Sequence, residues 1–507
     1  MSWQHIQAIR AHLADEIGPP FEEGPRRVCL LYPSPYRVGM SSLGFQWIHN
    51  VLVDAGYSVE RAFLPDDPDA WRKSRTPLLS YETQTPVNEF AVIGISVAYE
   101  LELAGLITAF ELAGIPPLRK HRSEKDPRIL MGGPLTFSNP LPATPFVDAM
   151  LLGESEEVVA AAVDSGLSDT REAWLDTIET LAGGFVPERC SDPFGRIVLP
   201  PVAKASDLML PARSRIVTPN AELRNMFLLE GERGCHRSCS FCVMRRSTNG
   251  GMRLVSPERI LSFVPDYAKR VGLVGAAISD HPKLVPLLQA LVDAGKGIGI
   301  SSLRADRVSL KPDIARLLRE GGYKTLTVAS DAASQRLRRT ISKGTVERHL
   351  HRCAELASQY KYKVLKVYMM VGLPDECEED LEELVRFSLE LAAIHPTALG
   401  IAPFVPKFNT PMIGSGFAGI KVVEKRLKYI QKALRGKVDV RSTSARWAWV
   451  EAILAQGGAK EGMALYDAVQ AGGRFADYKE AFGDSDGRAM AALDRSVVVD
   501  VEQAAAV

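Results

Sequence analysis

Short apolar runs alternate with helical patterns along most of this chain, and this alternation limits the possible folds more than any other feature. Buried strands that alternate with helices are typical of a parallel sheet covered on both faces. We therefore predict an α/β fold whose first domain, residues 27–163, is a doubly wound Rossmann-like parallel sheet, preceded by an N-terminal helix at 1–26. The expected strands of this sheet cover residues 27–33, 58–64, 91–99, 128–134 and 148–154.

A second alternating series follows residues 164–224, a proline-rich stretch that we expect to be a connector. Six strand–helix steps in this series predict a partial (β/α)6 TIM-type barrel over residues 225–415, with its chemistry at the strand ends. Residues 416–507 are charged and helical in pattern, and predict a small helical C-terminal domain. The expected barrel strands cover residues 227–234, 273–279, 297–303, 325–330, 364–372 and 398–404.

Charge and hydropathy narrow the function classes. The 507 residues carry 61 Lys and Arg and 61 Asp and Glu, so the formal net charge is zero. A neutral chain gives no support for bulk nucleic-acid binding through a broad basic surface, although it leaves room for a local basic groove. No run approaches about 18 apolar residues, so we expect no membrane span. The amphipathic N-terminus carries acids and lacks a small-residue cleavage site, which predicts a cytoplasmic protein.

The distribution of the seven cysteines points to one metal site. Cys235, Cys239 and Cys242 fall within eight residues after the first barrel strand. Three thiolates on one loop can hold an iron–sulfur cluster or zinc, because sulfur donors select these soft centres. Structural zinc normally takes four protein ligands, and His236 is awkwardly placed to be the fourth. We favour a cluster, with zinc and unliganded thiols as alternatives. The other cysteines are isolated and predict ordinary thiols: Cys29, Cys190, Cys353 and Cys377.

The pattern C-x3-C-x2-C, with Phe241 before the last cysteine, resembles the motif of the radical S-adenosylmethionine (SAM) superfamily. The resemblance implies that Cys235, Cys239 and Cys242 hold a [4Fe–4S] cluster whose open iron binds the amino and carboxylate groups of SAM. One electron then cleaves SAM to methionine and a 5′-deoxyadenosyl radical, which abstracts hydrogen from a substrate. Phe241 would lie beside the adenine. An electron donor such as flavodoxin or ferredoxin is implied as a partner.

Two loops of the barrel carry further residues that the resemblance assigns to SAM. Family members usually have a Gly-Gly-Glu-like segment after the second strand, where backbone groups receive the SAM ammonium; here residues 276–281 read Ala-Ala-Ile-Ser-Asp-His. Ser279 and Asp280 could offer oxygens to the ammonium instead, or could belong to a turn with a helix N-cap. Ser302 and Arg304 resemble a segment that contacts SAM, and a guanidinium suits its carboxylate. A surface ion pair is the alternative for Arg304.

Residues 330–338 resemble the Glu-Ala-Gly-Ser-x-Arg-x-Arg segment of one large branch, with Asp331 in place of the glutamate. The resemblance implies SAM contacts for Asp331, Ser334 and Arg338, while the other cations of this segment fit a solvated helix face. The segments around residues 364–380 and 404–411 also match patterns of this branch. Lys407, in the second of them, is expected to face either substrate or solvent.

The N-terminal domain resembles the cobalamin (B12)-binding domain that precedes the barrel in another radical SAM group. Cobalamin proteins with a lower axial histidine carry D-x-H-x-x-G after the first strand, whereas residues 33–39 here read Pro-Ser-Pro-Tyr-Arg-Val-Gly. The resemblance therefore implies base-off binding, with Tyr36 and Arg37 near the lower face of cobalt. The loops expected to hold the nucleotide tail contain Gly132, Gly133, Gly153 and Glu154. A degenerate domain kept for packing or substrate binding is the alternative.

These observations favour a radical SAM enzyme that performs cobalamin-dependent methylation of an unactivated carbon. The alternatives are a cobalamin-independent oxidation, cyclisation or carbon–carbon coupling by the same radical, and a non-catalytic metal-binding scaffold. A methylthiotransferase is disfavoured, because that group needs three further cysteines for a second cluster and the remaining four are isolated. Small metabolites, lipids and peptides all stay open as substrates, and the sequence assigns no catalytic residue beyond the cluster ligands.

Overall fold

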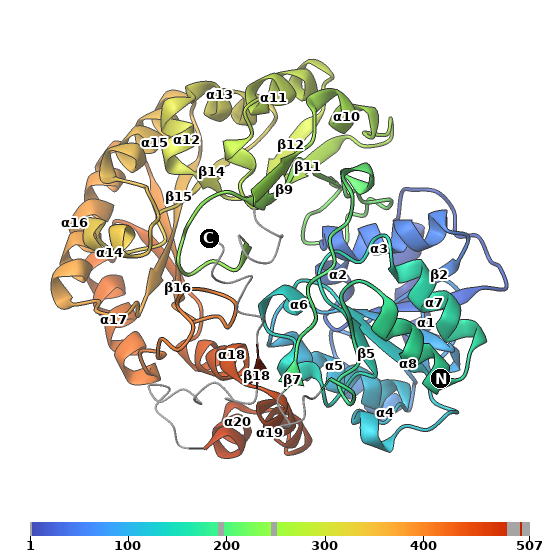
Figure 1. Cartoon of the computed structure of the whole chain (residues 1–507). Helices are drawn as coiled ribbons and strands as arrows, with labels where there is room; N and C mark the ends of the chain where they lie inside the picture. Colours follow the sequence, from blue (N-terminus) through green and yellow to red (C-terminus); the bar gives the residue numbers. More distant parts are fainter. Residues whose placement is uncertain (1–2, 191–196, 245–250, 484–496, 499–507) are drawn as a thin grey trace.

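The computed structural model describes residues 3–190, 197–244, 251–483 and 497–498. Figure 1 shows an N-terminal sheet domain, blue to teal, beside a curved barrel sheet, green to orange. The predicted α/β organisation is confirmed: the N-terminal domain and the barrel are both built mainly from parallel strands with helices between them. None of the helices in these ranges combines the length and the apolar character that a membrane crossing requires.

The N-terminal sheet has the strand order β2-β1-β3-β4-β5-β6, in which only β6 runs antiparallel. Its strands are β1 (Arg27–Tyr32), β2 (Ser58–Phe63), β3 (Val92–Ser96), β4 (Arg128–Gly132), β5 (Ala149–Leu151) and β6 (Gly184–Phe185). The strand order reverses between β1 and β3, and in doubly wound sheets ligands bind beyond the carboxyl ends of the strands at such a switch point. The loops after these two strands therefore mark the functional end of the domain.

The strands form because their apolar side chains are buried on both faces of the sheet. Five of the six residues of β1 are buried, and helices cover each face. The helices are α1 (Trp3–Ala14), α2 (Tyr36–Gly39), α3 (Leu43–Asp54), α4 (Pro68–Ser74), α5 (Glu102–Ala113), α6 (Leu135–Ser138), α7 (Val159–Ser168) and α8 (Arg171–Thr180). Residues 171–185, expected to belong to the connector, instead form α8 and β6 and extend this domain.

The barrel consists of two adjoining parallel sheets, β8-β11-β12 and β13 to β17. Its strands are β8 (Phe227–Glu230), β11 (Arg270–Val274), β12 (Gly297–Ile300), β13 (Leu303–Arg304), β14 (Thr325–Ala329), β15 (Val364–Val371), β16 (Thr397–Pro403) and β17 (Asp439–Ser442). Strand β17 was not predicted; it pairs in parallel with β16 and comes from the region expected to be helical. The first predicted strand is divided, since β9 (Glu232–Cys235) leaves β8 and pairs antiparallel with β10 (Gly251–Leu254).

Helices surround the barrel and continue into the C-terminal region. They are α10 (Pro257–Ser262), α11 (Leu284–Asp293), α12 (Ala305–Leu310), α13 (Pro312–Glu320), α14 (Gln335–Thr340), α15 (Glu347–Gln359), α16 (Glu378–Ile394), α17 (Ile420–Leu434), α18 (Ala445–Gln456), α19 (Ala459–Gln470) and α20 (Phe475–Phe482). Helix α19 packs on α5 of the N-terminal domain, and the buried amide of Asn139 donates to the carbonyls of Leu454 and Gly457 at the end of α18. The C-terminal helices thus connect the two sheet domains.

Candidate metal centre and cofactor cavity

The three clustered cysteines lie on one short loop that begins at the end of β9. The backbone N–H of Arg237 donates to Cys235 Sγ at 3.4 Å, and the N–H of Cys242 donates to the carbonyl of Cys239 at 3.2 Å. Cys239 Sγ lies 3.8 Å from the carbonyl oxygen of Ser342, in the turn after α14. The loop is therefore held at the barrel by backbone contacts while its thiols stay half-buried.

Electrostatics favour the protonated form of two of these thiols, Cys235 and Cys242. Burial raises the pKa of Cys235 and of Cys242, and the neighbouring cysteines raise both further. In the part of the chain that the structure describes, no three His, Cys, Asp or Glu side chains are gathered closely enough to hold a metal ion. A metal centre would have to draw the thiolates together and compensate their charge, as metal binding generally couples to deprotonation and local folding. The partly buried ring of Phe241 packs against the core beside Cys242.

Asp280, expected to offer an oxygen to the SAM ammonium, is already bound by arginines. Its side chain is fully buried, Arg237 donates to it at 2.7 and 2.8 Å, and Arg307 pairs with the same carboxylate. Burial opposes ionisation, but the hydrogen bonds from these two guanidiniums lower the pKa of Asp280 to about 2. Because Arg237 belongs to the cysteine loop, Asp280 ties that loop to the segment after β11. The sequence prediction missed both arginine partners.

Arg304 lies in the same region and keeps one donor free. The residue is buried rather than part of a surface ion pair, and its Nη2 donates to Asp306 at 3.0 Å. Its Nε is buried without a hydrogen-bond partner among the described residues and lies 3.8 Å from Asp280 Oδ2. The backbone N–H of Arg304 donates to Ser279 Oγ at 3.1 Å, so this hydroxyl is also engaged, whereas Ser302 is exposed.

The segment after β14 uses its predicted SAM residues for internal contacts. Arg338 is fully buried and donates to Ser330 Oγ at 3.2 Å, while burial lowers the pKa of its guanidinium. Ser334 caps α14 by accepting the N–H of Leu337 at 3.2 Å, and Asp331 pairs with Lys343. The SAM contacts implied for these residues stay predictions, and in this structure the side chains stabilise the loop.

Lys407, expected to face either substrate or solvent, is held in an ion triad. Its ammonium donates to Glu100 at 2.7 Å and to Glu451 at 2.8 Å. Glu100 follows β3 in the N-terminal domain and Glu451 lies on α18, so this ion triad joins the barrel to both other parts of the chain. The match of residues 404–411 to a family pattern gave no sign of these distant partners.

A cavity of about 290 Å³ lies in the N-terminal domain along the carboxyl halves of β3 and β4. Four of the residues predicted to hold a cobalamin tail meet here: Gly132, Gly133, Gly153 and Glu154. Gly133 (φ 95°) and Gly153 (φ 99°) adopt left-handed backbone conformations, and a Cβ would come within 2.8 Å of Val97 and 2.5 Å of Ala203, respectively. A Cβ at Gly132, in contrast, would meet nothing closer than 4.0 Å.

The walls of this cavity are mostly apolar, and its polar end lies against the barrel. Side chains from α3 and α7 cover it, among them Phe45, Trp47, Ile48 and Val159. At the polar end, Glu154 pairs with Arg253, and Arg233 donates to Glu156 at 2.6 Å. This network joins the N-terminal domain to the segment before the cysteine loop. Charged residues are rarely buried unless they are paired. The three charged residues within positions 230–233 are therefore the sequence feature that could have indicated this ion-pair network.

Tyr36 and Arg37, the other predicted cobalamin residues, lie elsewhere. The hydroxyl of Tyr36 donates to Glu16 at 2.6 Å, and its ring stacks on His12 with centroids 4.4 Å apart. Arg37 pairs with Asp66 on the loop after β2. Both residues line a separate surface hollow, so the structure does not bring them to the apolar cavity.

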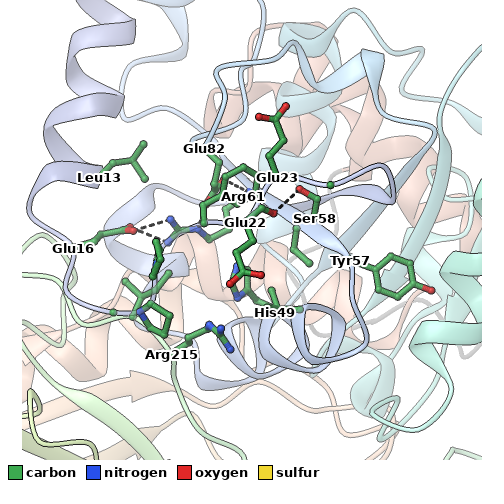
Figure 2. A pocket seen from close by; sticks show the side chains of 18 of the residues that line it. Leu13, Glu16, Glu22, Glu23, His49, Tyr57, Ser58, Arg61, Glu82 and Arg215 are labelled. Atoms are coloured by element: carbon green, nitrogen blue, oxygen red, sulfur yellow. Dashed lines mark hydrogen bonds and ion pairs between the residues drawn. The ribbon is translucent and has the colours of Figure 1, made fainter.

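Another cavity, of about 410 Å³, lies at the edge strand β2 beneath residues 16–24 and is shown in Figure 2. Three of its charged groups bind one another, since Arg61 pairs with Glu16 at 2.8 Å and with Glu82 at 2.6 Å. Burial lowers the pKa of His49 to about 3, so its imidazole is neutral. None of the predicted site residues lines this cavity.

Comparison with protein families gives two matches. Residues 44–187 match the family described as radical SAM proteins, N-terminal, and residues 231–388 match the radical SAM superfamily. Together these matches cover more than half of the chain. The second begins directly before the cysteine loop and includes every predicted SAM residue.

Several curated relatives and solved structures are similar to the chain. An uncharacterized protein of Methanocaldococcus jannaschii is 27% identical over 81% of this chain and 84% of its own length. The ribosomal protein uS12 methylthiotransferase RimO of Desulfosudis oleivorans is 25% identical, over 45% of this chain and only 54% of its own length. The radical SAM methyltransferase TsrM of Kitasatospora setae, solved with tryptophan and a SAM analogue, is 16% identical, with a TM-score of 0.55 over 79% of this chain and 76% of TsrM. This last likeness shows the fold.

Proposed function

This chain belongs to the radical SAM superfamily and is therefore an enzyme, and we propose that it methylates an unactivated carbon of its substrate with the help of cobalamin. In this proposal Cys235, Cys239 and Cys242 hold a [4Fe–4S] cluster, SAM binds beside it, and cobalamin lies between the barrel and the N-terminal domain. An electron donor of the flavodoxin or ferredoxin type would reduce the cluster.

The cysteine loop fits a cluster on its donor chemistry. Three thiols on one backbone-anchored loop offer sulfur donors, and the raised pKa values of Cys235 and Cys242 favour a cationic centre that compensates the thiolates. When bound, such a cluster supplies the electron that cleaves SAM. Asp280 and Arg237 hold the loop against the segment after β11, which fixes where the thiols are presented.

Arg304 fits the carboxylate of SAM, because its buried Nε lacks a hydrogen-bond partner among the described residues. A buried donor without a partner is costly, and a carboxylate would satisfy it with a charge-assisted hydrogen bond. Arg304 would thereby orient the amino-acid end of SAM toward the cysteine loop.

The observation that carries the cobalamin proposal is the apolar cavity at Gly132, Gly133 and Gly153. Its glycines permit close backbone approach, and its apolar walls suit the planar aromatic base of a nucleotide tail. Residues 33–42, after β1, contain no histidine, so this loop provides no imidazole for cobalt and binding would be base-off. A second solved structure of TsrM, 14% identical with a TM-score of 0.53 over 77% of this chain and 75% of TsrM, contains cobalamin and a [4Fe–4S] cluster.

Anaerobic reconstitution with iron, sulfide, SAM and cobalamin tests this proposal. We expect a brown protein that retains cobalamin on gel filtration, forms 5′-deoxyadenosine under reduction, and yields S-adenosylhomocysteine when a methyl acceptor is present. Formation of 5′-deoxyadenosine without cobalamin retention would favour oxidation, cyclisation or coupling by the radical alone. A colourless zinc protein that leaves SAM intact would refute the enzyme proposal. Formation of a second cluster would favour a methylthiotransferase.

A further inference from the structure

Glu232 is a buried carboxylate with one oxygen that no group in the described chain satisfies. It begins β9, three residues before Cys235, and is almost fully buried. Its Oε1 accepts the backbone N–H of Ala277 at 2.6 Å, in the segment after β11. Its Oε2 is buried and has no hydrogen-bond partner among the described residues.

Such an oxygen is stabilised by a proton or by a hydrogen-bond donor, most strongly by a cationic one. An unpaired buried carboxylate costs several kcal/mol, and the group normally either binds a cation or stays protonated. Burial raises the pKa of Glu232 to about 7, and repulsion from the carboxylates of Glu230 and Asp280 adds to the shift. Glu230 is engaged with Arg233, and Asp280 with Arg237 and Arg307, so none of these arginines is bound to Glu232.

The carboxylate of Glu232 packs against Gly275, where the absence of a side chain leaves room for it. A Cβ on Gly275 would lie 2.4 Å from Glu232 Oε1, so only glycine leaves room for the carboxylate here. The carboxylate therefore lies against the start of the segment 275–280, whose other end carries Asp280 of the arginine network.

The segment 275–280 also contacts Arg304, which is positively charged and has a buried N–H donor, Nε, without a hydrogen-bond partner among the described residues. Ala277 donates to Glu232, and Ser279, two residues later, accepts the backbone N–H of Arg304. One buried acceptor and one buried donor thus lack partners on either side of a short loop next to the cysteines. A ligand that satisfies both must carry a cation and an anion close together, as the α-ammonium and α-carboxylate of an amino acid do.

We propose that Glu232 binds the α-ammonium of SAM while Arg304 binds its α-carboxylate. This inference rests on the proposed function, since SAM is the amino-acid cofactor that the barrel is proposed to bind. Family members usually bind the SAM ammonium with a Gly-Gly-Glu-like segment after the second barrel strand. The corresponding loop after β11 contains no glutamate here, and Glu232 on β9 would bind the ammonium instead.

The variant Glu232→Gln tests the assignment, because its amide oxygen can still accept the N–H of Ala277 while the charge is removed. The matched control is Glu102→Gln in the N-terminal domain, where a buried carboxylate likewise accepts a backbone N–H, that of Ala98, at 2.6 Å. SAM affinity is measured on cluster-loaded protein by equilibrium dialysis and by the change that SAM causes in the electron paramagnetic resonance (EPR) spectrum of the reduced cluster. We expect Glu232→Gln to weaken binding by about 10- to 100-fold, the effect of a charge-assisted hydrogen bond, and the control to match wild type.

A binding cycle separates a direct contact from a structural effect. Wild type and Glu232→Gln are each titrated with SAM and with an analogue that lacks the α-amino group. Loss of the amino group removes a contact to the cluster iron in both proteins, so it should weaken binding to both, and the penalty in wild type should exceed that in Glu232→Gln by about 10-fold or more. An equal penalty in both proteins, or wild-type SAM affinity in Glu232→Gln, overturns the inference. If Glu232→Gln loses its cluster, Gly275→Ala replaces it in the cycle, since its Cβ displaces the carboxylate. Failure of wild type to bind SAM would instead overturn the proposed function.

Discussion

Filling the apolar cavity should abolish cobalamin binding without disturbing the fold. Gly132 lines this cavity, has no left-handed backbone conformation to lose, and leaves a Cβ free to 4.0 Å, so Gly132→Phe can place a ring where the proposed tail base lies. Burial of an aromatic group of about 200 Å² at about 25 cal/mol per Å² is worth about 5 kcal/mol. Exclusion of the base should therefore weaken cobalamin binding by about 10³- to 10⁴-fold.

The assay is cobalamin retained per chain after reconstitution and gel filtration, followed by the visible absorption of the corrin. The matched control is Gly24→Phe, because a Cβ at Gly24 also has 4.0 Å of free space but faces the other cavity. We expect Gly24→Phe to retain cobalamin as wild type does and both variants to hold the same iron. Normal retention by Gly132→Phe would refute the assignment of this cavity, and a wild type that retains none would support the degenerate-domain alternative.

Three further predictions follow from the geometry. Replacing Asp280 by Asn should lower the free energy of unfolding by about 2 kcal/mol at pH 7, because the pKa of Asp280 falls from 3.8 to about 2 on folding. This contribution is present above about pH 4 and is lost as the pH falls toward 2. Equal stability of the two proteins in urea at pH 7 would contradict the prediction. Lys407→Met should lower the free energy of unfolding by about 1–3 kcal/mol, and with it Tm, because Glu100 stays buried without its cation. An unchanged calorimetric melting curve would show that the ion triad does not stabilise the contact between the domains. Cobalamin-loaded protein in the Co(II) state should give an EPR spectrum without superhyperfine splitting from an axial nitrogen, and such splitting would exclude base-off binding without a histidine.

The sequence predicted the two α/β domains because most of their strands are apolar and are separated by helical patterns. Strand β17 was missed because its residues are mostly polar and exposed, so it lacks the apolar run that marked the other barrel strands. The cysteine loop was predicted from spacing alone, since its three residues are local in sequence.

Contacts between distant segments could not be predicted in the same way. Asp280 resembled a ligand-binding acid, but its partners come from the cysteine loop (Arg237) and from helix α12 (Arg307), and nothing in the sequence pairs them. Arg338 was predicted to contact SAM, and only the structure shows that it is fully buried and donates to Ser330. Glu232 lies among charged neighbours in the sequence, and only the structure shows that its carboxylate is buried with one oxygen unpaired.

The most direct test of the account is the iron content and SAM cleavage of the protein without its clustered cysteines. Anaerobically reconstituted wild type should hold about four irons per chain and release 5′-deoxyadenosine, whereas the triple variant Cys235→Ala, Cys239→Ala, Cys242→Ala should do neither. The control variant, with all four isolated cysteines replaced by Ala, should behave as wild type; these residues are Cys29, Cys190, Cys353 and Cys377. Iron binding and SAM cleavage that persist in the triple variant would contradict the assignment of the cluster, and with it the proposed function.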